Sequence, residues 1–297
     1  MKRIIPIFMI LISASLWGGI AIFVRKLNSI GFSSMEIVTI RVVIAALILG
    51  IFGLVKYRPQ MRIHIKDIKL FIGTGILSIV LFNWCFFFSV NEMNLSLAVI
   101  LLYTAPAFVA VFSLVFLGEK MDLLKIISVM GTILGCFLIA GVSQRDAGSI
   151  HTTGILIGLG AGFGYALYSI FGKFALVKYH SFTVTFYTFL VAALSLIPVT
   201  GLWRKAELLG NVEVLGYGLG LGLFPTVIAF LLYTKGLEKI ESSKAAIIAT
   251  MEPVVATLLS VFLYKESFGV IQAIGSCIIL GSVVIINLPK KQKASIQ

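Results

Sequence analysis

Ten separate stretches of this sequence are apolar enough and long enough to cross a lipid bilayer as helices. A helical span needs about 20 mostly apolar residues. Such stretches lie at 4–24, 34–55, 68–90, 95–118, 123–142, 153–172, 181–200, 212–234, 243–264 and 269–288. At about 20 residues each they use ~200 residues, which leaves no room for a soluble domain in a chain of 297. The runs are too long and too uniformly apolar for barrel strands, so the sequence predicts an all-α membrane protein.

The composition excludes the other broad classes of protein. Hydrophobic residues make up 59% of the chain and charged residues 12%, against about 45–50% and about 25% in a soluble domain. Disordered, collagen-like and disulfide-rich chains are excluded by the same values. Cys85, Cys136 and Cys277 each lie inside an apolar run without a neighbouring cysteine or histidine. The sequence therefore predicts no metal site, no redox site and no cofactor.

The distribution of lysine and arginine predicts the topology. With the N-terminus in the cytoplasm, 17 of the 24 basic residues fall on the cytoplasmic side, six on the other side, and Arg41 inside a span. This bias follows the positive-inside rule. We expect a multi-pass protein of the cell (inner or plasma) membrane, with both termini cytoplasmic and an uncleaved first span. The net charge of +12 is then a topology signal rather than a nucleic-acid-binding surface.

The chain partly matches itself when it is shifted by 147 residues. The segment Asn94–Glu119 then falls on Glu241–Glu266, and Pro106 falls on Pro253. Chance matches are common in apolar sequence, but a proline and a terminal glutamate at one offset are harder to obtain by chance. The pattern predicts an internal repeat.

The repeat divides the chain into two five-span halves, 1–146 and 147–297. Because five is odd, the second half enters the membrane upside down relative to the first. Inverted repeats of this kind recur in secondary transporters, whose substrate site lies near the midplane between the repeats. We therefore expect ten helices in two inverted repeats.

Several short motifs, in this order and spacing, are typical of one family. They are Ser15-Leu16-Trp17-Gly18, Arg41, Tyr103-Thr104-Ala105-Pro106 with Gly118-Glu119, and Met251-Glu252-Pro253 with Lys265-Glu266. Over nearly its whole length the chain resembles the EamA-type carriers of the drug/metabolite transporter superfamily, although Lys265 stands where that family often has glycine. The resemblance implies a ten-helix carrier, commonly an exporter of amino acids or other small metabolites. The alternative functions are an importer and a polyspecific drug/metabolite carrier of the same fold.

Two charged residues inside spans are the leading candidates for a substrate or coupling-ion site. Glu252 lies near the middle of the ninth span, where an ionisable group costs roughly 2.5–3.5 kcal/mol on insertion scales. It either binds substrate or a proton, or satisfies backbone groups freed by Pro253. Arg41 lies in the outer half of the second span. It either holds a substrate carboxylate or has a structural role with its head reaching the interface.

Aromatic and amide side chains inside the spans extend the candidate site. Those deep enough to line a cavity are Trp17, Asn83, Trp84, Tyr103, Tyr168 and Tyr187. Of these, we expect Trp17, Asn83, Tyr103 and Tyr168 to join Glu252 and Arg41. Each could instead serve packing or the interfacial aromatic belt.

The prolines, glycines and span-ending glutamates suggest roles in bending, packing and capping the helices. Pro106 and Pro253 lie near mid-span, where each removes a backbone hydrogen bond, so they are candidate hinges, with plain kinks as the alternative. The sixth span carries a small-xxx-small series through Gly158, which predicts a close helix contact. Glu119 and Glu266 end their spans and fit capping or structural roles.

Other functional classes find little support in the sequence. The three histidines lie in loops, and the sequence contains no HExxH, GxSxG or P-loop motif, which argues against an enzyme and a primary pump. A channel remains an alternative to a carrier. The expected partners are a small-molecule substrate and the lipid bilayer, with protons and a homodimer left open and no nucleic acid.

Overall fold

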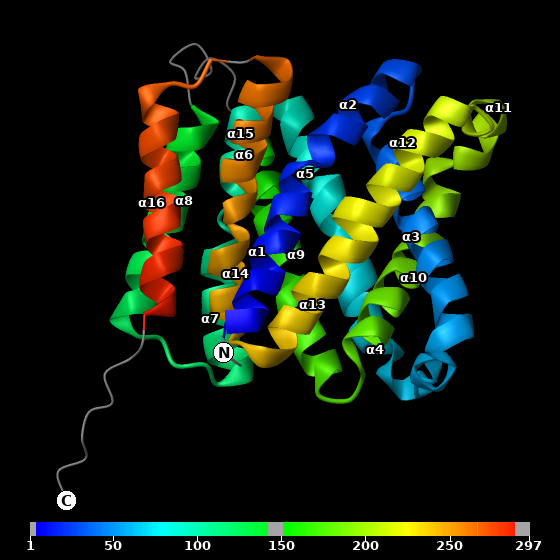
Figure 1. Cartoon of the computed structure of the whole chain (residues 1–297), viewed down its shortest axis with the longest axis horizontal. Helices are drawn as coiled ribbons and strands as arrows, with labels where there is room; N and C mark the ends of the chain where they lie inside the picture. The colour runs from blue at the N-terminus through cyan, green and yellow to red at the C-terminus, as the bar shows by residue number, and fades with distance from the viewer. Residues whose placement is uncertain (1–3, 142–150, 266, 289–297) are drawn as a thin grey trace, which may run out of the picture.

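The chain folds into a bundle of ten membrane-spanning helical segments. A computed structural model describes residues 4–141, 151–265 and 267–288, and across these residues it contains helices and no strand. Ten segments are long and apolar enough to cross a membrane (Figure 1). They are Ile4–Ile30, Ser34–Lys56, Ile65–Glu92, Leu95–Leu117, Leu123–Ala140, Thr152–Leu176, Ser181–Thr200, Val212–Lys239, Ser242–Tyr264 and Val270–Asn287. The ten predicted spans are confirmed, with ends that differ by a few residues.

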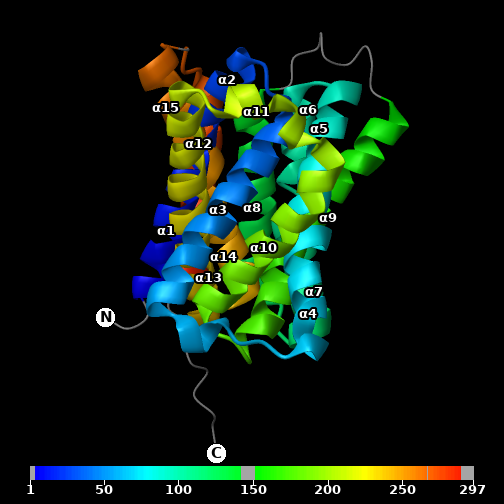
Figure 2. The same ribbon diagram turned by 90° about the vertical axis from the view of Figure 1, so that its right-hand side faces the viewer.

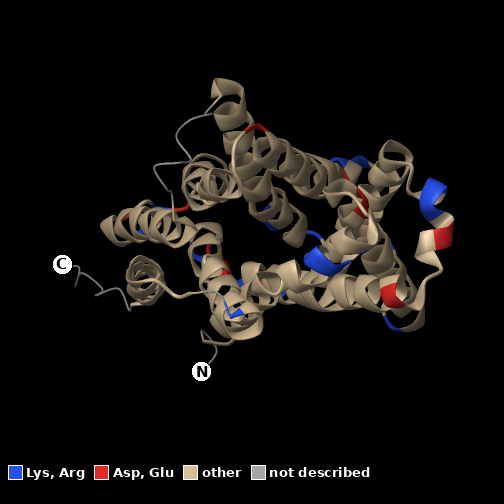
Figure 3. Cartoon of the chain, turned by 90° about the horizontal axis from the view of Figure 1, so that it is seen from above, with Lys and Arg blue, Asp and Glu red and all other residues tan. Residues whose placement is uncertain are grey.

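Consecutive spans run in opposite directions. The start of the first span and the end of the tenth lie at the same end of the bundle, which we call the terminal face (Figures 1 and 2). The other end is the opposite face. Seen from above, most of the ribbon carries no charged residue (Figure 3), as expected for helices whose outer surfaces contact lipid.

The first five spans contain several breaks and irregular turns. Their helices are α1 (Ile4–Gly18), α2 (Ile20–Ile30), α3 (Ser34–Lys56), α4 (Ile68–Ile72), the π-helical segment η3 (Gly73–Val80), α5 (Leu81–Glu92), α6 (Leu95–Leu102), α7 (Ala105–Leu117) and α8 (Leu123–Ala140), with short 3₁₀ turns at Arg58–Met61 and Ile65–Asp67.

The second five spans also contain breaks and a π-helical segment, although their first span is one unbroken helix. Their helices are α9 (Thr152–Leu176), α10 (Ser181–Thr200), α11 (Ala206–Leu209), α12 (Val212–Gly222), the π-helical segment η6 (Leu223–Ile228), α13 (Ala229–Lys239), α14 (Ser242–Ala249), α15 (Met251–Tyr264) and α16 (Val270–Asn287), with a 3₁₀ turn at Leu202–Lys205.

The helix boundaries repeat with the sequence offset of 147 residues. Shifted by this amount, α6 coincides with α14 and α8 with α16 at both ends, and α3 begins where α10 begins. The two π-helical segments also overlap after the shift. The offset found in the sequence therefore corresponds to a repeated series of helices.

Local capping explains where several helices begin. Ser33 and Glu36 form a capping box at the start of α3. Asn94 accepts a hydrogen bond from the amide of Leu97 at 2.8 Å at the start of α6. Each cap satisfies amide groups that have no partner within the helix, so the chain can turn back sharply into the next span.

The fourth and ninth spans are each interrupted near their middle. α6 ends at Leu102 and α7 begins at Ala105, while α14 and α15 are separated by Thr250. Pro106 and Pro253 lie in the first turns of α7 and α15, where their missing N–H groups are least costly. The expected departures from straight helices at both prolines are present; their role as hinges stays a prediction.

The glycines of α9 allow a close helix contact, as their spacing predicts. A Cβ atom placed on Gly162 would lie 2.8 Å from the backbone oxygen of Leu101. One on Gly164 would lie 3.0 Å from the backbone nitrogen of Phe82. Only glycine lets α9 approach α5 and α6 this closely.

Candidate functional site

A central cavity of about 380 Å³ lies between the helices of the two halves. Its wall is mainly apolar and aromatic, with a few polar groups, as is typical of small-molecule sites. Its lining comes from α1, α2, α3, α5, α6, α12 and α15. It is therefore enclosed by segments that are distant in sequence.

The cavity reaches the opposite face of the bundle. Its lining includes Ser34 at the start of α3 and Leu95 at the start of α6, together with Arg25 in the middle of α2. The starts of α3 and α6 both lie at the opposite face (Figure 1). At its inner end the cavity reaches Glu252, in the first turn of α15.

Glu252 is positioned by a helix break and by a direct helix contact. The interruption at Thr250 places Glu252 in the first turn of a new helix, where the dipole favours a negative charge. A Cβ atom on Gly18 would lie 2.9 Å from the backbone oxygen of Glu252. Glycine at position 18 therefore lets α1 pack directly against α15 beside the carboxyl group.

Arg41 faces the cavity from the second span. Arg41 is 6% exposed, and its Nε atom is buried without a hydrogen-bond partner. Arg41 and Glu252 interact electrostatically, but no direct ion pair joins them. Two opposite charges thus line one cavity without a direct ion pair, an arrangement that can hold a solute carrying both charges.

The sequence prediction of the site is largely consistent with this arrangement. Glu252, Arg41, Trp17, Tyr103 and Asn83 all line the same cavity. The phenol of Tyr103 is within hydrogen-bonding reach of Glu252. The amide of Asn83 donates to the Ile79 oxygen at 2.7 Å. Whether these side chains bind a substrate stays a prediction.

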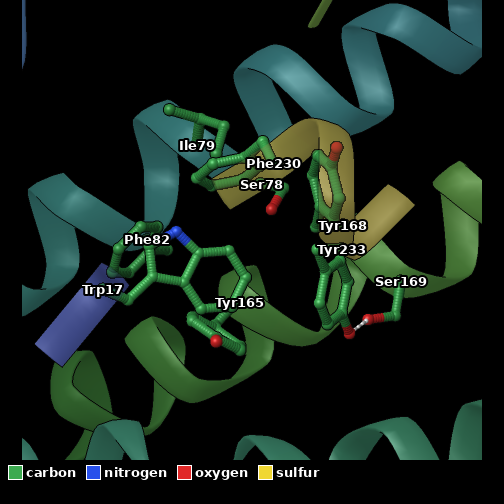
Figure 4. A pocket seen from close by; sticks show the side chains of 9 residues that line it. All are labelled: Trp17, Ser78, Ile79, Phe82, Tyr165, Tyr168, Ser169, Phe230 and Tyr233. Carbon is green, nitrogen blue, oxygen red and sulfur yellow. Dashed lines mark hydrogen bonds between the residues drawn. The ribbon is translucent and has the colours of Figure 1, made fainter. Parts of the chain in front are cut away.

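Tyr168 lies outside this cavity. It lines an adjoining smaller pocket, which shares Trp17 and Phe82 with the cavity (Figure 4). Its hydroxyl is 2.6 Å from the hydroxyl oxygen of Thr234. Tyr168 is thus next to the predicted site, on its inner side.

Two aromatic residues that seemed deep enough to line a cavity do not line this one. Trp84 is 48% exposed, because it lies on the outer side of α5. The hydroxyl of Tyr187 donates to the Met61 oxygen at 2.7 Å, which holds it near the terminal face.

Sequence reasoning missed part of the aromatic wall. Phe82, Phe86 and Phe87 line the cavity, but nothing in a run of phenylalanines shows which of them face inwards. The π-helical turn before α5 shifts the register of this helix. Within this stretch the sequence pointed to Asn83, which lines the cavity, and to Trp84, which does not.

At the terminal face, a carboxyl group of the first half joins the second half. Glu119 follows α7 and accepts hydrogen bonds from the Ser242 and Ser243 amides and from the Ser243 hydroxyl, the last at 2.6 Å. Lys125, 1% exposed, lies 3.5 Å from Glu119 and 3.1 Å from Glu241. We call this group the Glu119 latch; it caps α14 as the sequence suggested for a terminal acid.

The latch stabilises the ionised form of Glu119. Burial alone would raise the pKa of Glu119, but the hydrogen bonds from Ser243 and Ser242 and the charge of Lys125 outweigh it. The pKa of Glu119 therefore lies below its ordinary value. The bundle is closed here by a charged contact and open at the other end of the cavity.

The polar and aromatic groups of the cavity are suited to binding a small molecule. Among the described residues, no group of three or more histidine, cysteine, aspartate or glutamate side chains is placed to hold a metal ion. The cavity offers two arginines, Arg25 and Arg41, one carboxyl group and aromatic walls, which can orient a small polar molecule.

Comparison with known proteins agrees with the geometry. The EamA-like transporter family matches the chain twice, over residues 4–141 and over residues 152–288. The chain belongs to the EamA-like transporter family. The two matches coincide with the two series of five spans, and with the ten helices they make this a multi-pass membrane transporter.

Two relatives of similar length are named as transporters. The chain is 26% identical over 280 residues to an uncharacterized transporter of Archaeoglobus fulgidus, covering 93% of this chain and 94% of the relative. It is 24% identical over 295 residues to the uncharacterized inner membrane transporter YicL of Salmonella typhimurium, covering 96% of each chain. One solved structure, 18% identical, superposes with a TM-score of 0.77 over 95% of this chain and 96% of its own, which shows a shared fold.

Proposed function

We propose that this EamA-family transporter is a secondary active carrier that exports amino acids or related small metabolites by alternating access. The observation that carries the proposal is the central cavity, which both Arg41 and Glu252 line and in which their charges interact. An amino acid has a carboxylate and an ammonium group on one carbon, so it can meet both charges at once. The aromatic wall leaves room for an apolar side chain.

The proposal includes the orientation of the protein and its symmetry. The terminal face is the cytoplasmic one, in agreement with the distribution of basic residues, and the cavity then faces outwards. The halves 1–146 and 147–297 are inverted repeats, which is supported by the shared helix boundaries and the two family matches. Inverted repeats give two states of similar energy that open to opposite sides.

A proton is the proposed coupling ion. Glu252 is the carboxyl group that faces the cavity among the described residues lining it. Carrying an uncompensated charge across the membrane costs about 2.3 kcal/mol per 100 mV. Protonation of Glu252 on one side and release on the other would avoid part of this cost.

The test is transport by purified protein in liposomes. A panel of amino acids and nucleosides is offered with and without a pH gradient, and accumulation is followed with labelled solutes. The proposal expects saturable, gradient-dependent movement of at least one amino acid. Movement of nucleosides alone would refute the amino-acid assignment, and a flux that does not saturate would favour a channel.

A further inference from the structure

A seam of buried hydroxyl groups lies between the cavity and the terminal face. The Tyr168 hydroxyl is 2.6 Å from that of Thr234, and Thr185 donates to Thr234 at 3.3 Å. Thr188 donates to Thr74 at 2.6 Å. All five residues are at most 5% exposed. They join η3, α9, α10 and α13, so we call them the hydroxyl seam.

Every residue of the hydroxyl seam is 147 positions from a residue that lines the open cavity. The pairs are Ala21 with Tyr168, Val38 with Thr185, Arg41 with Thr188, Phe87 with Thr234, and Leu221 with Thr74. If the halves are inverted repeats, the seam occupies, on the terminal side, the place that the cavity wall occupies on the opposite side.

A small space remains at the inner end of the seam (Figure 4). Its volume is about 20 Å³, room for about one water molecule. The indole nitrogen of Trp17 and the hydroxyl of Ser78 face into it, and both are buried without a hydrogen-bond partner. These residues are 6% and 1% exposed. Such groups are costly when they are buried unpaired, and a polar molecule in this space would complete their hydrogen bonds.

The Glu119 latch closes the same region at the terminal face. Ser242, which donates its amide to Glu119, lies 147 positions after the cavity-lining Leu95. Leu95 lines the open cavity at the opposite face, and its offset partner Ser242 belongs to the Glu119 latch at the terminal face. The hydroxyl seam thus extends from the small pocket beside Trp17 towards the terminal face, which the Glu119 latch closes.

We propose that the hydroxyl seam is the closed form of a second cavity, which opens to the terminal face and binds a small polar solute through neutral hydroxyl groups. The proposal rests on the carrier function above. Thr188 stands where the first half has Arg41, and Ala105 where the second half has Glu252. The second cavity therefore has no charged residues of its own at those two positions. Arg41 and Glu252 would contact the solute in both states, and the hydroxyl groups would add neutral hydrogen bonds in the second one.

The test is labelling of a single buried cysteine from each side of the membrane. Thr188→Cys is placed in a protein whose Cys85, Cys136 and Cys277 are replaced by serine, and reconstituted in one orientation. An impermeant maleimide should modify it from the terminal face at least 5-fold faster than from the opposite face. Val38→Cys should show the reverse preference.

A control variant separates opening of the seam from general loosening. Ser89 is fully buried and donates to the Gly154 oxygen at 3.2 Å, and neither it nor its offset partner Gly236 lines the cavity. Ser89→Cys should stay unmodified from both sides. If Thr188→Cys does not fold, Thr185→Cys replaces it with the same expectation.

The outcome is independent of the transport assay. A folded Thr188→Cys protein that is unreactive from the terminal face, or reacts faster from the opposite face, overturns the second cavity even if transport is normal. Absence of transport of every solute in the panel would refute the carrier proposal alone, because labelling requires exchange between states and no net flux.

Discussion

At the scale of single residues, the site depends on two charges placed where lipid would otherwise exclude them. Glu252 follows a helix break and lies against Gly18, while Arg41 is buried with an unpaired Nε. Ionisable groups at this depth are costly, and a direct ion pair would have reduced that cost. The lack of a direct ion pair agrees with our proposal that a solute binds between the two charges.

Replacement of Glu252 by glutamine should abolish gradient-driven transport while the protein still folds and inserts. Glutamine keeps the shape and hydrogen-bonding reach of glutamate but cannot ionise. Solute exchange without a gradient should survive if Glu252 only couples, and fail if it also binds the solute. The measurement is accumulation in liposomes with a pH gradient, with Glu213→Gln as a control because Glu213 is an exposed acid paired with Lys26. Full accumulation by Glu252→Gln would leave Glu252 as a packing residue.

Lys265 should be a site where a single change stabilises the protein. It ends α15 with a φ of 55°, the one positive φ of a non-glycine residue in the described ranges. Its offset partner Gly118 adopts a φ of 66°. A left-handed conformation costs a residue with a Cβ roughly 1–2 kcal/mol.

Lys265→Gly should therefore raise the free energy of unfolding by about 1 kcal/mol, measured by thermal unfolding in detergent. Gly118→Lys should lower it by a similar amount. A lower Tm for Lys265→Gly would mean that the lysine side chain makes a compensating contact.

At the scale of helices, the sequence predicted most of the architecture. Span number, the 147-residue repeat and the breaks at Pro106 and Pro253 all follow from hydropathy, offset matching and the chemistry of proline. The π-helical segments could not be predicted, because no local signal marks one extra residue per turn. The register of α5 depends on that turn, so the sequence indicated Trp84 as deep enough to line a cavity and did not indicate Phe82.

Buried polar partners were also beyond sequence reasoning. Lys125 was counted among the cytoplasmic basic residues in the topology prediction, yet it is buried between Glu119 and Glu241. Its partners come from distant helices, and apolar periodicity does not show which faces meet.

Glu119→Gln should weaken closure at the terminal face. The change removes the charge that accepts bonds from α14 and leaves Lys125 with Glu241 alone. We expect a loss of about 1.5–3 kcal/mol, typical of hydrogen bonds to charged groups, measured as a lower Tm in detergent at pH 7. Glu207→Gln, an exposed acid at the opposite face, should have little effect.

The effect of Glu119→Gln should depend on pH in a defined direction. Because the folded-state pKa of Glu119 is lowered, its stabilisation is complete above the unfolded value of about 4.3. It is lost as the pH falls through the lower folded-state pKa. The Tm difference between wild type and variant should be constant from about pH 7 to pH 5 and shrink below about pH 4. A difference that persists undiminished in acid would show that the carboxylate charge is not responsible.

At the scale of the whole molecule, the two ends of the bundle differ. The opposite face opens into the cavity, and the terminal face is closed by the Glu119 latch and the hydroxyl seam. Helices that match after the 147-residue shift thus line the open cavity in one half and form the closed hydroxyl seam in the other. This asymmetry is what one state of an alternating-access carrier should show.

The inverted arrangement can be tested by sidedness. Lys120→Cys and Lys265→Cys, each in a protein without its native cysteines, should react with an impermeant maleimide from different sides of the membrane, residue 120 from the cytoplasmic side. The measurement is labelling in intact cells against inside-out vesicles. Reaction of both positions from one side would contradict the inversion.

The central claim is that a solute binds between Arg41 and Glu252 and crosses with a change of state. Counterflow tests it directly: liposomes loaded with unlabelled amino acid are diluted into a trace of labelled amino acid, and uptake is followed over time. The account predicts a transient accumulation that saturates with concentration and is lost in Arg41→Gln. Uptake that is independent of the internal solute and rises linearly with concentration would contradict it.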